Sequence, residues 1–141
     1  YDTNLEILKA ANVKSEDLLV CTGNDFADSL SASSAGKPIM LVDKSLTKEQ
    51  KTYLKRLDRN KKAYVIGGTR GVSASLESGL NTYASDGVNR LYEINRYETS
   101  RTVAETFFKT ADYCTCVGSK FPGWPPFRGI IGNVNGALLC L

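Results

Sequence analysis

The chain has 141 residues, with 18 basic and 15 acidic side chains, a formal net charge of +3, and no histidine. This length fits one domain, or one domain with a fragment of a second. The charge is too mild to indicate nucleic acid by itself, and no apolar run approaches the roughly 18 residues of a membrane span. Without histidine, the commonest general base and many catalytic triads are excluded.

Short apolar runs alternate with amphipathic stretches along the chain. The apolar runs predict strands at 18–21, 39–42, 63–66 and 88–94. The spacing of apolar residues predicts helices within 5–13, 26–35, 46–57 and 72–83. Thr99 and Ser100 are suitable N-caps for a further helix, and a strand is expected at 113–117. Strands that alternate with helices indicate βαβ units, so we expect an α/β fold: a Rossmann-like or flavodoxin-like three-layer sandwich with a mostly parallel sheet.

The basic residues are concentrated in one of these predicted helices and the loop after it. Only Glu49 and Asp58 balance the seven basic side chains of this stretch, which are Lys48, Lys51, Lys55, Arg56, Arg59, Lys61 and Lys62. Such a run is usually a solvated helix face. The alternative is a surface that attracts a polyanion.

The four cysteines do not form a metal-binding pattern. None belongs to a C-x-x-C pair, and the chain has no histidine to complete a zinc site. We interpret Cys21, Cys114, Cys116 and Cys140 as small buried hydrophobic residues, and we expect no metal and no cofactor.

The sequence contains an internal repeat. Tyr1-Asp2-Thr3 is echoed by Tyr97-Glu98-Thr99, and each is followed by a predicted helix and an apolar strand. The first strand leads into "GNDF" at residues 23–26 and the second into "GSKF" at 118–121; "PIMLV" and "GALLCL" follow later at a similar offset. Five features in one order at a near-constant spacing predict one full repeat at 1–96, with its core at about 17–96, and a partial second repeat at 97–141. A chain that starts at Tyr is expected to be an excerpt, so it carries no information on export.

The second copy departs from the first at residues 121–136. Its "FPGWPPFRGIIGNVNGA" contains two adjacent prolines and Trp124, where the first copy has a helix start, "FADSLSASSAGKPI". Adjacent prolines cannot lie inside a regular helix. This segment is therefore either divergent or frame-disturbed, because one extra G before codons for Asp-Gly-Leu would be read as Gly-Trp-Pro.

Two glycine-rich turns and one basic residue are the features that could bind a ligand. "GNDFADS" and "IGGTRG" follow predicted strands, at the ends where open α/β sheets bind ligands. The second turn lacks the Lys-Ser/Thr of a phosphate loop. Asp25 and Asp28 are expected to cap a helix. Arg96 offers a rigid fork for phosphate or carboxylate, and Tyr97 a ring with a hydroxyl group. Alternatively, Arg96 binds backbone carbonyls or a neighbouring repeat, and Tyr97 fills the interface.

"GNDFADSLSAS", "PIMLV", "AYVIGGTRGVS" and "RLYEINRYETSRTVAETFF", in this order, closely resemble the type 2 cell-wall-binding repeat of Gram-positive surface proteins. The resemblance covers 17–101 well. It implies a Rossmann-like module, usually three in tandem around a pseudo-threefold axis, that attaches a secreted surface or S-layer protein non-covalently to an anionic wall polysaccharide. A separate domain of the same polypeptide typically carries the enzymatic or adhesive activity.

The family motifs fall on three segments of this chain, around 23–30, 38–41 and 95–99. Together with the residue chemistry they give the expected ligand-binding set, which comprises Asn24, Asp28, Ser29, Pro38, Ile39, Met40, Leu41, Arg96, Tyr97 and Thr99. Met40 replaces the usual Leu. The expected partners are an anionic wall glycopolymer and neighbouring repeats of the same chain, or further copies when the module is isolated, with neither nucleic acid nor membrane insertion.

Two alternatives remain open at this point. The chain could be a purely structural repeat that oligomerises without a ligand of its own. It could also be a small-molecule or nucleotide-dependent enzyme on an open α/β sheet. The missing histidine and the incomplete phosphate motif count against this alternative. Thermal stabilisation by nucleotides with magnesium would support it.

Overall fold

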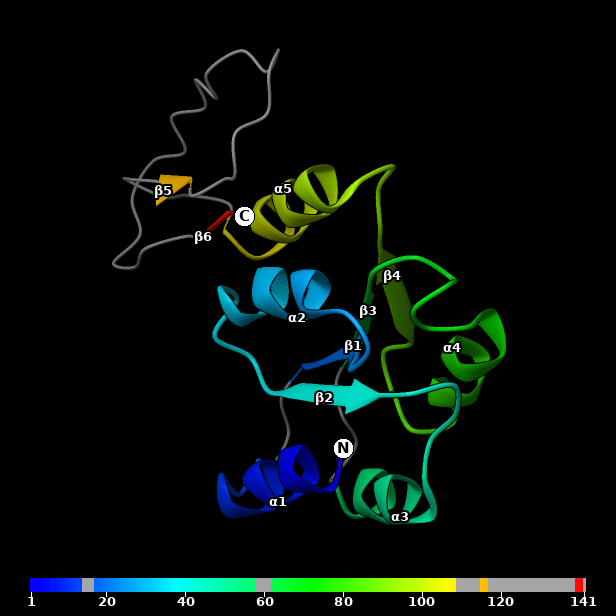
Figure 1. The fold of residues 1–141 in the computed structure, drawn as a ribbon. Helices are drawn as coiled ribbons and strands as arrows, with labels where there is room; N and C mark the ends of the chain where they lie inside the picture. The colour runs from blue at the N-terminus through cyan, green and yellow to red at the C-terminus, as the bar shows by residue number, and fades with distance from the viewer. Residues whose placement is uncertain (14–16, 58–61, 109–114, 117–138, 141) are drawn as a thin grey trace.

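The computed structural model describes residues 1–13, 17–57 and 62–108, together with the backbone of 115–116 and 139–140 (Figure 1). The five helices of these ranges are α1 (Asp2–Ala10), α2 (Phe26–Ser33), α3 (Lys48–Arg56), α4 (Ala74–Leu80) and α5 (Arg96–Phe107). The strands are β1 (Leu18–Thr22), β2 (Ile39–Val42), β3 (Ala63–Ile66), β4 (Val88–Leu91), β5 (Thr115–Cys116) and β6 (Leu139–Cys140).

Four of the strands form one all-parallel sheet in the order β2-β1-β3-β4. All five residues of β1 are buried, as expected of a central parallel strand that is covered on both faces. The alternation of strands and helices thus confirms the predicted α/β class. The strand predicted at 88–94 is shorter than expected, because the last ladder bond runs from the Gly67 N–H to the Leu91 carbonyl oxygen.

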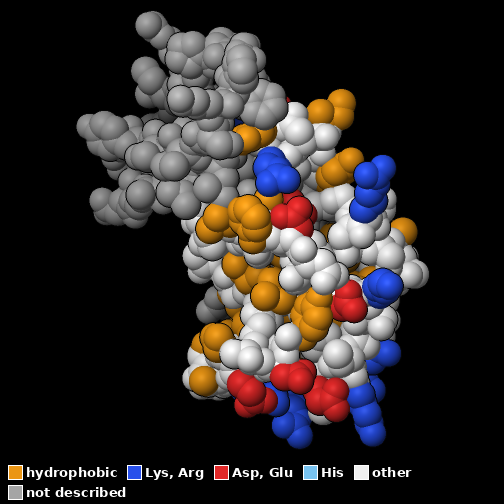
Figure 2. All heavy atoms as spheres, in the orientation of Figure 1, with side chains coloured by type: hydrophobic (Ala, Val, Ile, Leu, Met, Phe, Trp, Pro, Cys, Tyr) orange, Lys and Arg blue, Asp and Glu red, His pale blue; other side chains and the backbone are white. Residues whose placement is uncertain are grey.

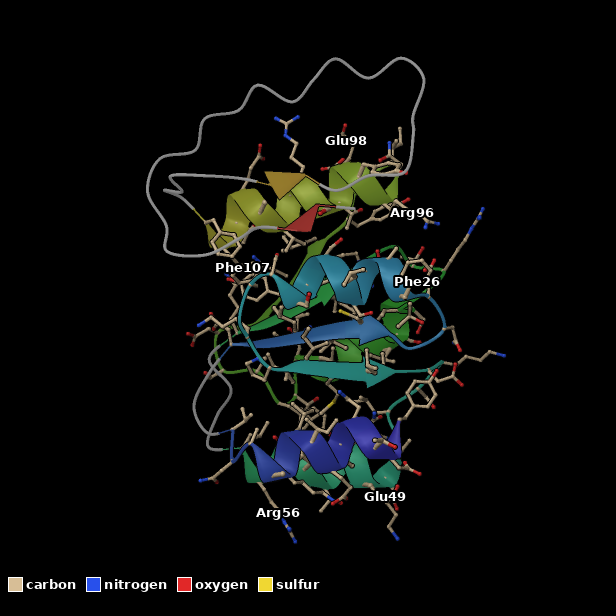
Figure 3. All side chains as sticks on the ribbon, turned by 60° about the vertical axis from the view of Figure 1, so that its left-hand side comes forward. Phe26, Glu49, Arg56, Arg96, Glu98 and Phe107 are labelled. Atoms are coloured by element: carbon tan, nitrogen blue, oxygen red, sulfur yellow. The ribbon has the colours of Figure 1, made fainter. Side chains whose placement is uncertain are left out.

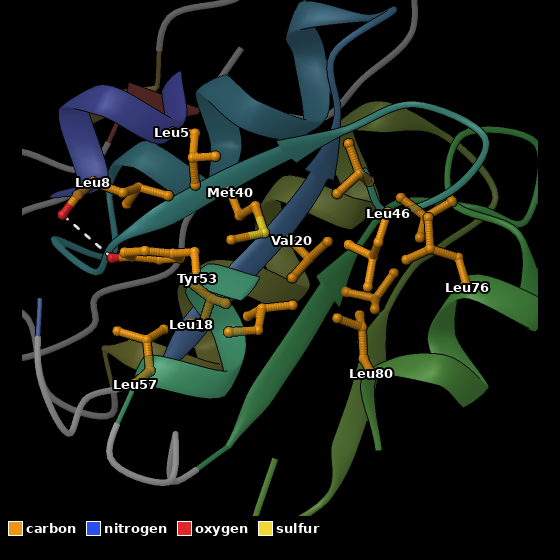
Figure 4. Close-up of a cluster of buried hydrophobic side chains, with 14 residues drawn as sticks. Leu5, Leu8, Leu18, Val20, Met40, Leu46, Tyr53, Leu57, Leu76 and Leu80 are labelled. Atoms are coloured by element: carbon orange, nitrogen blue, oxygen red, sulfur yellow. Dashed lines mark hydrogen bonds between the residues drawn. The ribbon is translucent and has the colours of Figure 1, made fainter. Parts of the chain in front are cut away.

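Helices cover both faces of the sheet and give the fold three layers. In Figure 1, α2 and α5 lie on one side of the sheet and α1 and α3 on the other, with α4 beside β4. On the α1–α3–α4 side, leucines of the helices pack against alternate residues of the strands, such as Val20, Met40 and Val65 (Figure 4). The opposite side holds a smaller cluster around Leu19, Ile66 and Val103. Cys21 belongs to it and is buried, as predicted; burial raises the pKa of its thiol far above the ordinary value, so it stays protonated.

Four helices begin at side-chain N-caps. Asp25 caps α2, Thr47 caps α3 in a capping box with Gln50, and Ser73 caps α4. The prediction for the last helix was wrong: Asn95 caps α5 by accepting from the N–H groups of residues 97 and 98. Thr99 and Ser100 lie buried inside α5, so the helix begins earlier than expected and its first turn contains Arg96 and Tyr97.

The edge strand β2 is covered by a side chain of α1. The Asn4 amide nitrogen donates to the Ile39 carbonyl oxygen at 2.9 Å, and its oxygen accepts from the Leu41 N–H at 2.9 Å. A side-chain amide thus imitates a neighbouring strand at the free edge of the sheet, and blocks the edge-to-edge pairing that such a strand invites.

The short strands β5 and β6 pair in parallel, as β1 and β2 do. Residues 115 and 116 lie opposite 139 and 140, while 20 and 21 lie opposite 40 and 41. The partial second repeat at 97–141 stays a prediction. The divergent segment 121–136, Cys114 and the ends of the predicted strand 113–117 lie outside the described residues.

Candidate functional site

The carboxyl ends of the four parallel strands meet at one edge of the sheet, which we call the carboxyl edge. It comprises the turns 23–25, 43–47, 67–73 and 92–95 that follow β1, β2, β3 and β4, together with the first turns of α2 and α5. The chain leaves β1 toward β2 on one side and β3 toward β4 on the other. Open α/β sheets bind ligands outside the strand ends where the connections diverge in this way. A ligand site is therefore expected at the carboxyl edge between β1 and β3.

A relay of polar side chains orders the turn after β1. The Asn24 side chain accepts a hydrogen bond from the Tyr1 hydroxyl at 3.1 Å and donates to Asp43 Oδ1 at 2.8 Å. The Tyr1 ring lies directly on Gly23, where a Cβ atom would overlap with it. Glycine leaves the space that the ring occupies here, and the hydrogen bond joins the Tyr1 ring to the Asn24 amide at the surface.

Asp28 lies at the centre of the carboxyl edge, in the first turn of α2. Its carboxylate lies against Gly67, which has a φ of +103° and has no room for a Cβ atom. Partial burial raises the pKa of Asp28 above its usual value, and the negative charge of Asp25 raises it further, while the positive charge of Arg96 lowers it. Within the described residues, no hydrogen-bond donor reaches this carboxylate. Asp28 can therefore still accept hydrogen bonds from a ligand.

Arg90 of β4 fixes the turn that follows β3. Its guanidinium donates to the Gly67 carbonyl oxygen at 2.7 Å and to the Val72 carbonyl oxygen at 2.8 Å. Two further bonds, at 2.8 and 3.0 Å, go to Glu77 Oε2. The rigid fork of arginine suits this arrangement, because one planar group ties both ends of the turn to the sheet and to α4.

Arg96 and several large apolar side chains are exposed at the same end of the molecule. Figure 3 shows Arg96 and Phe26 at the end toward which the strand arrows point. The exposed fractions are 68% for Phe26, 54% for Tyr92 and 90% for Ile94. The Tyr92 ring lies over Gly68, much as Tyr1 covers Gly23. A cation, a carboxylate, an amide and aromatic rings thus share one open surface.

Comparisons with known proteins identify the family. The sequence profile of the family described as "Cell wall binding domain 2 (CWB2)" matches residues 1–77, more than half of the chain. The chain belongs to the CWB2 family. It is accordingly a cell-wall-associated module of a surface protein. No curated protein sequence matches the chain.

Two solved structures have the same fold as this CWB2 module. Cwp6 from Clostridium difficile has a TM-score of 0.74 at 24% identity, over 82% of this chain and 20% of Cwp6. Cwp8 from the same organism has a TM-score of 0.72 at 26% identity, over 87% of this chain and 21% of Cwp8. The chain thus spans about a fifth of the length of either protein.

The structure brings together some of the predicted ligand residues of the CWB2 module and separates others. Asn24, Asp28, Arg96 and Tyr97 belong to the carboxyl edge. Ser29 donates its hydroxyl hydrogen to the Phe26 carbonyl oxygen, and the Thr99 hydroxyl accepts from the Glu93 N–H. The segment 38–41 lies in and just before β2, with Met40 fully buried and Pro38, Ile39 and Leu41 partly buried. These last residues shape the sheet beneath the edge and offer a ligand little surface.

Sequence reasoning missed Tyr1, Tyr92 and Arg90, which build the carboxyl edge of the CWB2 module. Glycines directly after strands were the available signal, since Gly23 and Gly68 each receive an aromatic ring. No spacing rule identifies which ring that is. Among the described residues, no group of three potential metal ligands is present, and no helix is long and apolar enough to cross a membrane.

Proposed function

We propose that this CWB2 module anchors a secreted bacterial surface protein non-covalently to an anionic cell-wall polysaccharide, which it binds at the carboxyl edge. Arg96 carries the proposal. Its side chain is exposed in the first turn of α5, and no carboxylate of the described residues lies within 4 Å of it. An exposed arginine without an ion-pair partner is well suited to a phosphate or carboxylate of the polymer.

The neighbours of Arg96 suit the remaining chemistry of a polysaccharide. Asp28 and the oxygen of Asn24 can accept hydrogen bonds from sugar hydroxyl groups, and Tyr97 contributes from the same turn of α5. The exposed rings of Phe26 and Tyr92 offer flat apolar surface to the C–H faces of sugars. Ser29 and Thr99 order the first turn of α2 and the start of α5 through their hydroxyl groups, and the segment 38–41 contributes to the sheet.

The proposed module binds and does not catalyse. The activity of the parent protein would then belong to another domain of the polypeptide, while the module packs against neighbouring repeats. Asp28 is the carboxylate whose pKa is raised at the edge; its charged neighbours are Arg96 and Asp25, and Asp25 is engaged in capping α2 through the Ala27 N–H. A binding role accounts for the exposed cation and rings without any reaction.

Retention of the purified chain on isolated cell walls tests this proposal. We expect binding that weakens as salt rises, because the attraction is electrostatic and exposed. Arg96→Ala should reduce retention by roughly five- to thirtyfold, since charge-assisted hydrogen bonds contribute about 1–2 kcal/mol at partly exposed sites. Lys51→Ala is the matched control, because it removes another exposed positive charge, from α3.

Two outcomes would overturn the proposal. Walls from which the anionic polymer has been stripped should no longer retain the chain, and unchanged binding to stripped walls contradicts an anionic ligand. Equal losses for Arg96→Ala and Lys51→Ala would indicate diffuse attraction in place of a site at the carboxyl edge.

A further inference from the structure

A second surface of the molecule has the features of an anion site, and it lies away from Arg96. Helices α1 and α3 run beside each other under the sheet, and a hollow of about 290 Å³ lies between their side chains. We call it the α1–α3 groove, lined by Lys9, Lys48, Glu49, Thr52, Tyr53 and Arg56. Figure 2 shows basic and acidic side chains together over these two helices, at the lower end of the view.

The floor of the α1–α3 groove is fixed. Tyr53 is 8% exposed and donates its hydroxyl hydrogen to the Leu8 carbonyl oxygen at 3.2 Å, a bond drawn in Figure 4. This carbonyl belongs to the last turn of α1, where carbonyl groups lack partners within the helix. Tyr53 therefore joins the two helices, and the groove between them has a defined width.

The cations of α3 have no ion-pair partners among the described residues, whereas Lys9 of α1 and Arg101 of α5 do. On α5, Arg101 contacts Glu105 at 2.8 Å and Glu98 at 3.9 Å, and on α1, Lys9 contacts Glu6 at 2.6 Å. On α3, neither Lys48 nor Arg56 lies within 4 Å of a described carboxylate, although Glu49 is on the same helix. The positive charge of the groove is therefore available to an external anion.

Local helix energetics explain Arg56 but not Lys48. A cation in the last turn of a helix complements the helix dipole, so Arg56 stabilises α3 without any ligand. Lys48 is the first residue of α3, at the positive end of the dipole, where a cation is unfavourable. The position of Lys48 lowers the stability of the folded chain. An anion bound to Lys48 would be attracted by both the lysine and the positive end of the helix.

The spacing of these charges favours a polymer over a small ion. Lys48, Thr52 and Arg56 follow one another at intervals of four residues, which places the backbone positions of the two cations about 12 Å apart along the helix axis. At this spacing, successive anionic groups of a chain can each meet one cation. Figure 3 shows Glu49, the neighbour of Lys48, at the same end of the molecule as Arg96, and Arg56 at the other end.

We propose that the α1–α3 groove is a second binding site of this module, which holds successive phosphate or carboxylate groups of an acidic polymer. The inference rests on the proposed function for the class of polymer, and it assigns a separate place on the molecule. Binding at the groove extends the contact from the carboxyl edge along α3.

Calorimetric titration of the full 141-residue chain at low salt tests the groove. The polymer probes are inorganic polyphosphate and polygalacturonate, and orthophosphate is the small-ion probe. Replacing both groove cations, Lys48→Ala with Arg56→Ala, should weaken binding of the two polymers about tenfold, because each exposed contact contributes roughly two- to fivefold. Lys51→Ala with Lys55→Ala is the matched control: it removes two charges from the same helix outside the groove lining, and should weaken binding about twofold.

A charge-conserving variant distinguishes loss of binding at the groove from loss of folding. Lys48→Arg with Arg56→Lys should keep most of the polymer affinity, and circular dichroism melting should be similar for all three double variants. Equal losses in the groove and control variants, or orthophosphate binding as tight as polyphosphate, would overturn the inference. These outcomes are independent of the wall experiment: retention on walls that depends on Arg96 would leave the proposed function intact even if the groove failed.

Discussion

At the scale of single residues, Asp28 is held in surroundings that disfavour its charge. Burial and the charge of Asp25 raise its pKa, and Arg96 offsets part of the shift. A carboxyl group whose pKa is higher in the folded than in the unfolded state binds its proton more readily when folded. Ionised Asp28 therefore lowers the free energy of unfolding, and this deficit develops as pH rises from the unfolded pKa through the folded pKa.

Asp28→Asn should remove this deficit. We expect a modestly higher melting temperature than for the wild type at pH 7, and a difference that shrinks as pH falls below the ordinary carboxyl pKa, where wild-type Asp28 is protonated in both states. Thermal unfolding followed by circular dichroism between pH 3 and 7 gives this profile. Asp86→Asn, at an exposed carboxylate, is the control and should leave the melting temperature nearly unchanged. A melting-temperature difference between Asp28→Asn and the wild type that grew as pH fell would contradict this role of Asp28.

At the scale of elements, one polar side chain of α1 pairs with the backbone of β2. Asn4 pairs with both a carbonyl oxygen and an N–H group of the edge strand, at 2.9 Å each. Asn4→Ala leaves both partly buried groups without their partner, and an unsatisfied group of this kind costs about 1–3 kcal/mol. We expect a loss of about 2 kcal/mol in the free energy of unfolding, measured by urea denaturation. Thr3→Ala, an exposed change on the same helix, should cost less than about 0.5 kcal/mol; equal losses would mean that the pairing contributes nothing.

The elements themselves followed from the sequence, but their boundaries and neighbours did not. Apolar runs located β1, β2 and β3 because central parallel strands are buried on both faces. The end of β4 depends on where its ladder with β3 stops, which apolar content alone does not encode. The start of α5 was misplaced for a related reason: several polar residues there can cap a helix, and Asn95 does so because the chain leaves the sheet just before it.

The candidate site was predictable only in part. Arg96 and Asn24 could be expected at one edge, because each follows the carboxyl end of a parallel strand. The resemblance predicts Met40 as a ligand residue, and its burial becomes visible only once β2 lies between the helices. The α1–α3 groove requires two helices that are separated by 37 residues of sequence, so no local pattern could reveal it.

At the scale of the whole molecule, the carboxyl edge exposes several large apolar side chains to solvent. Phe26, Tyr92 and Ile94 all lie there with more than half of each side chain exposed. In an array of repeats, such surface packs against the next repeat, and an isolated repeat can bury it only by self-association. A protein that self-associated but did not bind walls would favour a purely structural repeat over the proposed anchor.

Sedimentation velocity beside a wall pull-down separates these two roles. We expect the isolated chain to self-associate as its concentration rises, and Ile94→Asn to weaken this association by tenfold or more, because burying an isoleucine contributes about 1.5–3 kcal/mol. Ile7 is 61% exposed on α1, and Ile7→Asn is the matched control that should leave association unchanged. Since Arg96 remains in place, the Ile94→Asn variant should still bind walls. Loss of wall binding together with association would mean that the polymer is recognised only by the assembled repeats, with the carboxyl edge of one module insufficient by itself.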